Sequence, residues 1–191
     1  MHFETLSAVL SADSPQTILR GLDREVCPEL FALVGQTQPI KFHPEGDAFE
    51  HSLLVLGKVA AWTTDVNVRF AALFHDIGKG LTPREELPKH HNHDAKGAVL
   101  LKELNIPSSM KDIAVAVARW HMAVMSMKKV GKWLQCLKEC EEVGALEALR
   151  LTVLADSGKD LRILHLEVAK AILMADELTQ VSLIKEALSD I

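Results

Sequence analysis

Apolar residues recur at spacings of three and four along most of the chain, which is the pattern of amphipathic helices. Alternation with a period of two, which would predict strands, is nearly absent. The run IAVAVA at 113–118 has the composition of a strand, but it continues into ARWH without a turn residue, so we predict a buried helix there. The pattern therefore predicts an all-α helical bundle.

Helix start signals agree with this periodicity. Ser14-Pro15 begins one predicted helix, Asp47 with Glu50 predicts a capping box, and Asp65 is placed to cap a helix that runs to Asp76. Further helices are predicted after Asn92, from Ser108 to His121, and over 130–142, 143–156 and 160–178, with a short helical turn after Thr82-Pro83. No repeat, low-complexity tract or linker is evident. We expect one domain over 1–191, in which residues 1–40 pack against a core at 42–160.

Composition adds limits to this picture. The chain has 191 residues and is 48% hydrophobic, which is enough for a substantial core. Its formal charge of −5 excludes an overall basic field, so we expect no strong nucleic-acid binding. No apolar run approaches the ~18 residues of a membrane span, and the first residues carry no basic leader region. With three cysteines expected to be reduced, this predicts no membrane association and a cytoplasmic location; the oligomeric state is not indicated.

Side chains that bind metals lie at or near the predicted helix ends. These residues are His51, His75, Asp76, His93, His121 and Asp156. A single His-Asp pair arises by chance, and a lone histidine is more often a core or surface residue. Six such residues on five segments are not required by packing alone. Because helix ends can converge on one pocket, and imidazole with carboxylate suits divalent zinc, manganese, iron or nickel, the sequence predicts a metal site.

The stretch ALFHDIGKG at 72–80 places His75 and Asp76 together at a helix end. Consecutive helical residues are about 100° apart, so the two side chains can bracket one ion only if it lies beside the helix axis. We predict that Gly78 turns the chain away and leaves the ion accessible. Lys79 is either a favourable charge at the helix end or a group that offsets phosphoryl charge, and HHNH at 90–93 is either a solvated loop or a source of substrate contacts.

These residues resemble the HD-domain metal-dependent phosphohydrolases, whose ordered signature of H, then HD, then a distal D matches His51, His75-Asp76 and Asp156. The segments FHPEGDAFEHSLLVLG, VNVRFAALFHDIGKGLTPREELPKHHNHDAKG, AVARWH and LTVLADS resemble in particular the HD domain in the C-terminal part of bacterial multifunctional CCA-adding enzymes, the tRNA nucleotidyltransferases. The resemblance covers roughly 22–160 and is most specific over 42–97. It implies an all-helical HD fold with metal-dependent phosphatase, 2′-nucleotidase and 2′,3′-cyclic phosphodiesterase activities.

The resemblance also implies roles for individual residues. His51, His75, Asp76 and Asp156 would hold a divalent ion, which could be nickel, manganese, zinc, iron or magnesium. Related HD proteins use a histidine four residues before a glycine for a second ion, and His93 precedes Gly97 by that interval, so His93 and His121 are candidates for a second site. The chemistry of a metal-activated water attacking a phosphoryl group, rather than the resemblance, makes Asp76 and Lys79 the catalytic candidates and Lys79, His90 and His91 the substrate-binding candidates.

One departure from the CCA-adding enzymes changes the expected function. This sequence has neither the β pattern nor the length for their nucleotidyltransferase domain, so nucleotide addition to tRNA is not predicted. We expect a stand-alone phosphohydrolase that acts on small phosphomonoesters, nucleotides or 2′,3′-cyclic nucleotides. Two alternatives stay open. One is an HD-fold di-iron oxygenase that uses the same six ligands, and the other is a non-catalytic regulatory HD module that binds a nucleotide.

Overall fold

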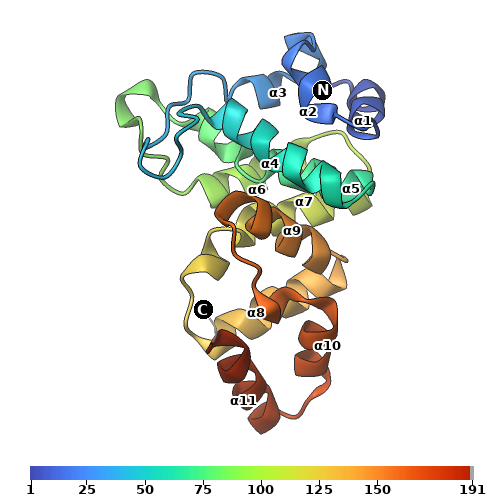
Figure 1. Cartoon of the computed structure of the whole chain (residues 1–191), viewed down its shortest axis with the longest axis vertical. Coiled ribbons are helices and arrows are strands. Elements are labelled where there is room, and N and C mark those ends of the chain that lie inside the picture. The colour runs from blue at the N-terminus through green and yellow to red at the C-terminus, as the bar shows by residue number, and fades with distance from the viewer. Residues whose placement is uncertain (190–191) are drawn as a thin grey trace.

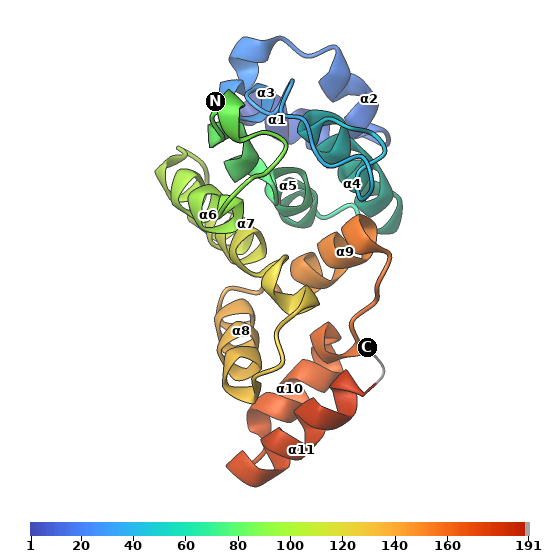
Figure 2. The ribbon, with the colours of Figure 1, turned by 90° about the vertical axis from the view of Figure 1, so that its left-hand side faces the viewer.

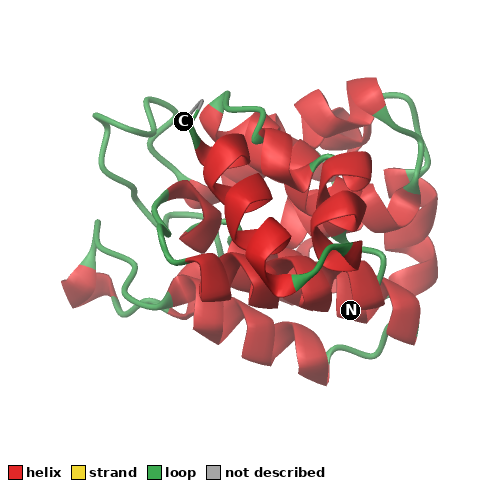
Figure 3. Ribbon diagram, turned by 90° about the horizontal axis from the view of Figure 1, so that it is seen from below, coloured by secondary structure: helices red, strands yellow, loops and turns green. Residues whose placement is uncertain are grey.

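The computed structural model describes residues 1–189, and this part of the chain is built from helices and loops without a strand (Figure 3). The α-helices are α1 (Phe3–Leu10), α2 (Pro15–Arg20), α3 (Pro28–Phe31), α4 (Ala48–Trp62), α5 (Val66–Phe74), α6 (His93–Glu103), α7 (Ser108–Trp120), α8 (Val130–Glu142), α9 (Leu146–Ser157), α10 (Leu166–Met174) and α11 (Glu177–Leu188). Five short 3-10 helices connect them: η1 (Arg24–Val26), η2 (Ile77–Leu81), η3 (Arg84–Glu86), η4 (Ala123–Met125) and η5 (Arg162–Leu164). The predicted all-α fold is confirmed.

Helix α5 lies in the upper part of the molecule and packs against α4, α7 and α9 (Figures 1 and 2). Every residue from Val68 to Phe74 is buried, so this helix is covered on all sides. The rings of Phe70 and Phe74 stack with centroids 4.3 Å apart. Because α5 is fixed so completely, the residues that follow it, His75 and Asp76, are placed with little freedom.

The N-terminal helices pack on α5 and its neighbours: α1 contacts α5, α2 contacts α4, and α3 contacts η2. The buried side chain of Arg69 connects α5 to the segment after α1 and to the end of α4. Its guanidinium donates to the carbonyl oxygens of Leu10 and Ala12 after α1, at 2.7 and 2.8 Å. It also donates to the carbonyl oxygens of Ala60 and Thr63 at the end of α4, at 2.9 and 2.7 Å.

Helices α8, α10 and α11 form a lower part of the molecule that α9 joins to the rest (Figure 1). The predicted single helix at 160–178 is wrong. The chain instead forms η5, then α10, breaks at Ala175, and begins α11 with Asp176 as the N-cap, whose carboxylate accepts a hydrogen bond from the Thr179 amide at 3.0 Å. A carboxylate in the middle of an apolar pattern was a helix start signal that periodicity alone did not reveal.

The predicted helix starts at Asp47, Asp65 and Asn92 are confirmed, but two of their predicted side-chain contacts are wrong. Asp47 accepts hydrogen bonds from the amides of Phe49 and Glu50, but Glu50 does not complete the capping box, because its carboxylate pairs with Arg20. Asp65 caps α5 as predicted. Helix α6 begins after Asn92 as predicted, yet the predicted side-chain cap is wrong: Asn92 has a left-handed backbone with φ 56° and makes no capping bond.

No helix within residues 1–189 has the length and apolarity needed to cross a membrane.

Candidate metal centre

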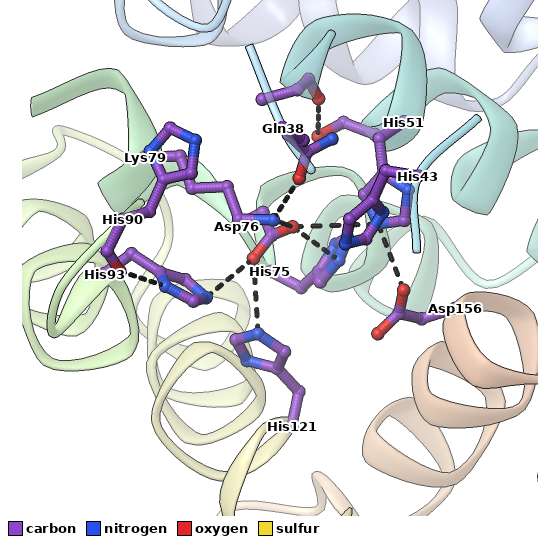
Figure 4. Close-up of polar contacts among 12 residues, drawn as sticks. Gln38, His43, His51, His75, Asp76, Lys79, His90, His93, His121 and Asp156 are labelled. Atoms are coloured by element: carbon purple, nitrogen blue, oxygen red, sulfur yellow. Dashed lines mark hydrogen bonds and ion pairs between the residues drawn. The ribbon is translucent and has the colours of Figure 1, made fainter. Parts of the chain in front are cut away.

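The structure brings all six predicted ligand residues to one place (Figure 4). They come from different elements: His51 from the first turn of α4, His75 and Asp76 from the junction of α5 and η2, His93 from the start of α6, His121 from the end of α7, and Asp156 from the end of α9. All are buried except Asp156, whose side chain is 20% exposed.

The carboxylate of Asp76 lies between two pairs of histidines. Its Oδ1 atom is 3.1 Å from Nε2 of His93 and 3.3 Å from Nε2 of His121. Its Oδ2 atom is 3.3 Å from Nε2 of His75 and 3.6 Å from Nε2 of His51. Two compact ligand triads therefore share this carboxylate, one with His51 and His75 and the other with His93 and His121. Asp156 extends the first triad, since its Oδ1 lies 3.1 Å from Nε2 of His51.

The opposite nitrogen of each ring is already engaged. The Nδ1 atoms of His75, His93 and His121 each lie 2.8 Å from a backbone carbonyl oxygen, those of Ala72, His90 and Ala118 respectively. Nδ1 of His51 lies 2.6 Å from Oε1 of Glu45. A carbonyl only accepts hydrogen bonds, so the three rings carry their proton on Nδ1. In the neutral ring, Nε2 then presents a lone pair towards Asp76.

This arrangement fits a divalent metal. The four Nε2 atoms are buried and have no hydrogen-bond partner in the part of the chain that the structure describes. A lone pair facing a carboxylate oxygen at 3.1–3.6 Å is unfavourable without a cation between them. With a divalent ion, both atoms become ligands, and imidazoles whose other nitrogen is held by a carbonyl or carboxylate are the usual metal-binding form.

Both acids are ionised at neutral pH. Burial alone would raise the pKa of Asp76, but the charge of Lys79 holds that pKa well below its usual range. Burial also opposes ionisation of Asp156, yet its contact with the imidazole of His51 and the nearness of His75 lower its pKa to about 2. The site therefore offers two negative charges to a cation.

Lys79 lies inside the site rather than at the surface. The η2 turn places it three residues after Asp76, and its buried ammonium donates to Asp76 Oδ2 at 2.5 Å and to the side chain of Gln38. An ammonium held beside the central carboxylate can also donate to an anionic ligand in the adjoining cavity.

A cavity of about 220 Å³ opens over these groups. Its lining residues include Gln38, His43, Asp76, Lys79, His90, His93, Met122 and Asp156. The ring nitrogens of His90 are occupied by contacts with the hydroxyl of Thr82 at 2.9 Å and the carbonyl of Thr37 at 3.0 Å, so His90 joins two loops at the cavity wall. His91 is exposed and does not line the cavity.

Sequence reasoning missed three residues of the site: Gln38, His43 and Glu45. Glu45 accepts from Nδ1 of His51 and lies 3.2 Å from Nδ1 of His43, so one carboxylate orients both rings. The side-chain oxygen of Gln38 accepts a hydrogen bond from the Lys79 ammonium. The available signal was the acid six residues before a candidate metal histidine, because such histidines usually donate to a carboxylate.

The predicted role of Gly78 is wrong. Gly78 is not among the glycines with positive φ in residues 1–189, and the chain continues through it as a 3-10 helix. A Cβ atom on Gly78 would lie 2.0 Å from the carbonyl oxygen of His93 and 2.5 Å from the amide nitrogen of Gly97. Glycine is needed here for close approach of η2 to α6.

The HD domain family model matches residues 48–157, more than half of the chain, and this segment contains all six ligand residues. The chain therefore belongs to the HD domain family, whose members are generally metal-dependent hydrolases.

Among curated proteins, the chain is 40% identical over 124 residues to a Multifunctional CCA protein of Shewanella denitrificans, covering 60% of this chain and 30% of that protein. It is 41% identical over 128 residues to a Multifunctional CCA protein of Thioalkalivibrio sulfidiphilus, covering 62% of this chain and 31% of that protein. The chain thus spans less than a third of the length of these relatives. No solved structure is similar enough to count as a match.

Proposed function

We propose that this protein is a divalent-metal-dependent phosphohydrolase of small phosphomonoesters or 2′,3′-cyclic nucleotides. The observation that carries the proposal is the set of four buried Nε2 atoms, without hydrogen bonds from the described residues, that face the two oxygens of Asp76. Membership of the HD domain family supports hydrolysis as the reaction.

The ligands divide into two sets in this proposal. His51, His75, Asp76 and Asp156 hold one ion, and Asp76, His93 and His121 hold a second, with Asp76 shared. A bound divalent ion polarises a phosphoryl oxygen and lowers the pKa of its water from about 15.7 to about 7.

The remaining residues bind and orient the phosphoester. Lys79 lines the cavity, and its ammonium donates to a phosphoryl oxygen, which offsets charge that develops during hydrolysis. Asp76 is the buried carboxylate best placed to accept a proton from the attacking water. His43, oriented by Glu45, presents its ring at the cavity wall, where it contacts the ester oxygen.

A substrate and metal screen tests this function. Phosphomonoesters, 2′,3′-cyclic nucleotides and intact tRNA are compared with nickel, manganese, zinc, iron and magnesium. Because the chain carries a net charge of −5, the small esters should be hydrolysed faster than tRNA. A clear preference for intact tRNA would overturn the small-ester assignment.

Asp76→Ala tests the site itself. It should lose both bound metal, measured by elemental analysis, and turnover. The control is Asp112→Ala, which removes an exposed acid outside the site and should keep both. Full metal occupancy and full activity in Asp76→Ala would refute the assignment.

The two triads that share Asp76 also suit a di-iron centre, which makes an oxygenase the second candidate. The two functions differ in what they consume. Iron-loaded protein that consumes O₂ and changes its visible spectrum, but releases no phosphate from any ester, would favour the oxygenase.

A further inference from the structure

A second cavity, of about 480 Å³, is lined by residues from η4, the loop before α8 and the segment after α9. Its lining residues include Met125, Met127, Lys128, Trp133, Lys159 and Leu188. None of the functions assigned above uses this space.

Some residues that line the second cavity lie close in the sequence to residues that line the metal cavity. Met122 lines the metal cavity and Val124 lines the second, while Asp156 lines the metal cavity and Lys159 lines the second. Two or three extended residues span at most about 7–11 Å, so the cavities lie side by side. In Figure 2 the two segments that carry these residues, η4 in yellow and the segment that follows α9 in orange, lie where the upper part of the molecule meets the lower part.

The described residues that line the second cavity carry positive charge. Lys128 and Lys159 are its charged lining residues, and neither forms an ion pair within residues 1–189. None of the described residues that line it is acidic, whereas the chain as a whole carries −5. Met125, Met127 and Leu188 supply an apolar surface between the two lysines and the protein interior. Apolar walls with a few placed charges suit a ligand that has both a flat apolar part and an anionic group.

We propose that this cavity is an anion subsite that extends the metal centre, so that the preferred substrates are nucleotides with two phosphate groups. The reacting phosphoryl group lies over Asp76 beside Lys79, and the second phosphate lies between Lys128 and Lys159. The sugar or base then covers the apolar surface. The inference rests on the proposed function, whose substrate class it narrows.

The test compares kcat/KM for release of the 2′-phosphate from adenosine 2′-phosphate and from adenosine 2′,5′-bisphosphate. Charge-assisted contacts to the second phosphate should favour the bisphosphate by about tenfold at low salt. In the double variant Lys128→Gln/Lys159→Gln this preference should fall to about one, while kcat/KM for the monophosphate stays unchanged. The matched control Lys138→Gln/Lys185→Gln removes two exposed charges elsewhere in the lower part and should keep the preference.

The outcomes separate the subsite from the function. If both esters are hydrolysed with equal kcat/KM and the lysine variant changes nothing, the subsite is wrong and the phosphohydrolase proposal stands. If neither ester is hydrolysed, the proposed function fails, and equilibrium dialysis of adenosine 2′,5′-bisphosphate decides the subsite. Weaker binding to the lysine variant than to the control supports the anion subsite, and equal binding overturns it.

Discussion

Gly78 packs backbone to backbone against Gly97: the amide nitrogen of Gly97 lies 2.5 Å from where a Cβ on Gly78 would be. Gly97 is one turn after His93 on α6, so both face η2. The contact brings the start of α6 close to the α5–η2 junction, and His93 consequently reaches Asp76 at 3.1 Å. The spacing of a histidine four residues before a glycine has a physical reason here. The glycine allows the close helix contact that brings the histidine to Asp76.

Gly78→Ala should lower the free energy of unfolding by about 1–3 kcal/mol, because the added methyl group meets backbone atoms that cannot rotate away. It should also weaken metal binding by the triad that contains His93. Urea denaturation and metal titration measure the two effects. The control Gly131→Ala adds a methyl group where nothing lies within 4 Å, inside α8, and should raise stability by about 0.5–1 kcal/mol. Equal stability of the two variants would contradict the packing argument.

His93→Ala and His121→Ala should each reduce metal stoichiometry from two ions to one. His93 and His121 both face Oδ1 of Asp76. Removing either ring leaves the other ligand set complete: His51, His75, Asp156 and Oδ2 of Asp76. Titrating the metal-free protein with manganese or nickel, while measuring turnover, gives the stoichiometry. One ion in the wild type and in both variants would reject the second site.

Glu45→Gln should weaken binding of the ion held by His51 by about 10–100-fold, because the carboxylate that orients this ring is lost. The expected signature is a higher metal concentration for half-maximal activity, with activity recovered at saturating metal. Glu86→Gln changes an exposed acid in η3 and serves as the control. Metal affinity unchanged in Glu45→Gln would show that His51 does not depend on this contact.

Arg69→Met should cost at least about 3 kcal/mol of unfolding free energy, because four carbonyl oxygens lose a charged donor. Metal stoichiometry of the folded variant should not change, since Arg69 lies at the other end of α5 from His75. Denaturant melts of Arg69→Met and of Arg84→Met, which alters an exposed arginine, measure the difference. A loss of less than about 1 kcal/mol would mean that water replaces the guanidinium.

Much of the fold could be predicted because the helices are regular and their start residues are explicit. Asp47 and Asp65 cap α4 and α5, and the predicted 130–142 helix has the bounds of α8. The predictions that failed concern positions where tertiary contacts determine the local structure. The carboxylate of Glu50 pairs with Arg20 instead of completing the capping box. Helix α10 ends at Met174 although the apolar pattern continues.

The convergence of ligand residues could be predicted from their common position at helix ends. The sequence did not give their division into two sets, because that depends on which oxygen of Asp76 each ring faces. Gln38 and Glu45 were missed because they lie in the loop before α4, where no periodicity indicates direction.

The contact between His51 and Asp156 joins two points about 100 residues apart in the chain. A metal ion held by both residues therefore acts as a cross-link, comparable in its topology to a long-range disulfide. Closing a loop of about this length removes conformational entropy worth roughly 4–5 kcal/mol from the unfolded chain in the simplest model. Occupancy of the centre would then strengthen the attachment of α9 to α4, so chelation should increase amide hydrogen exchange in α9 before the centre of α5.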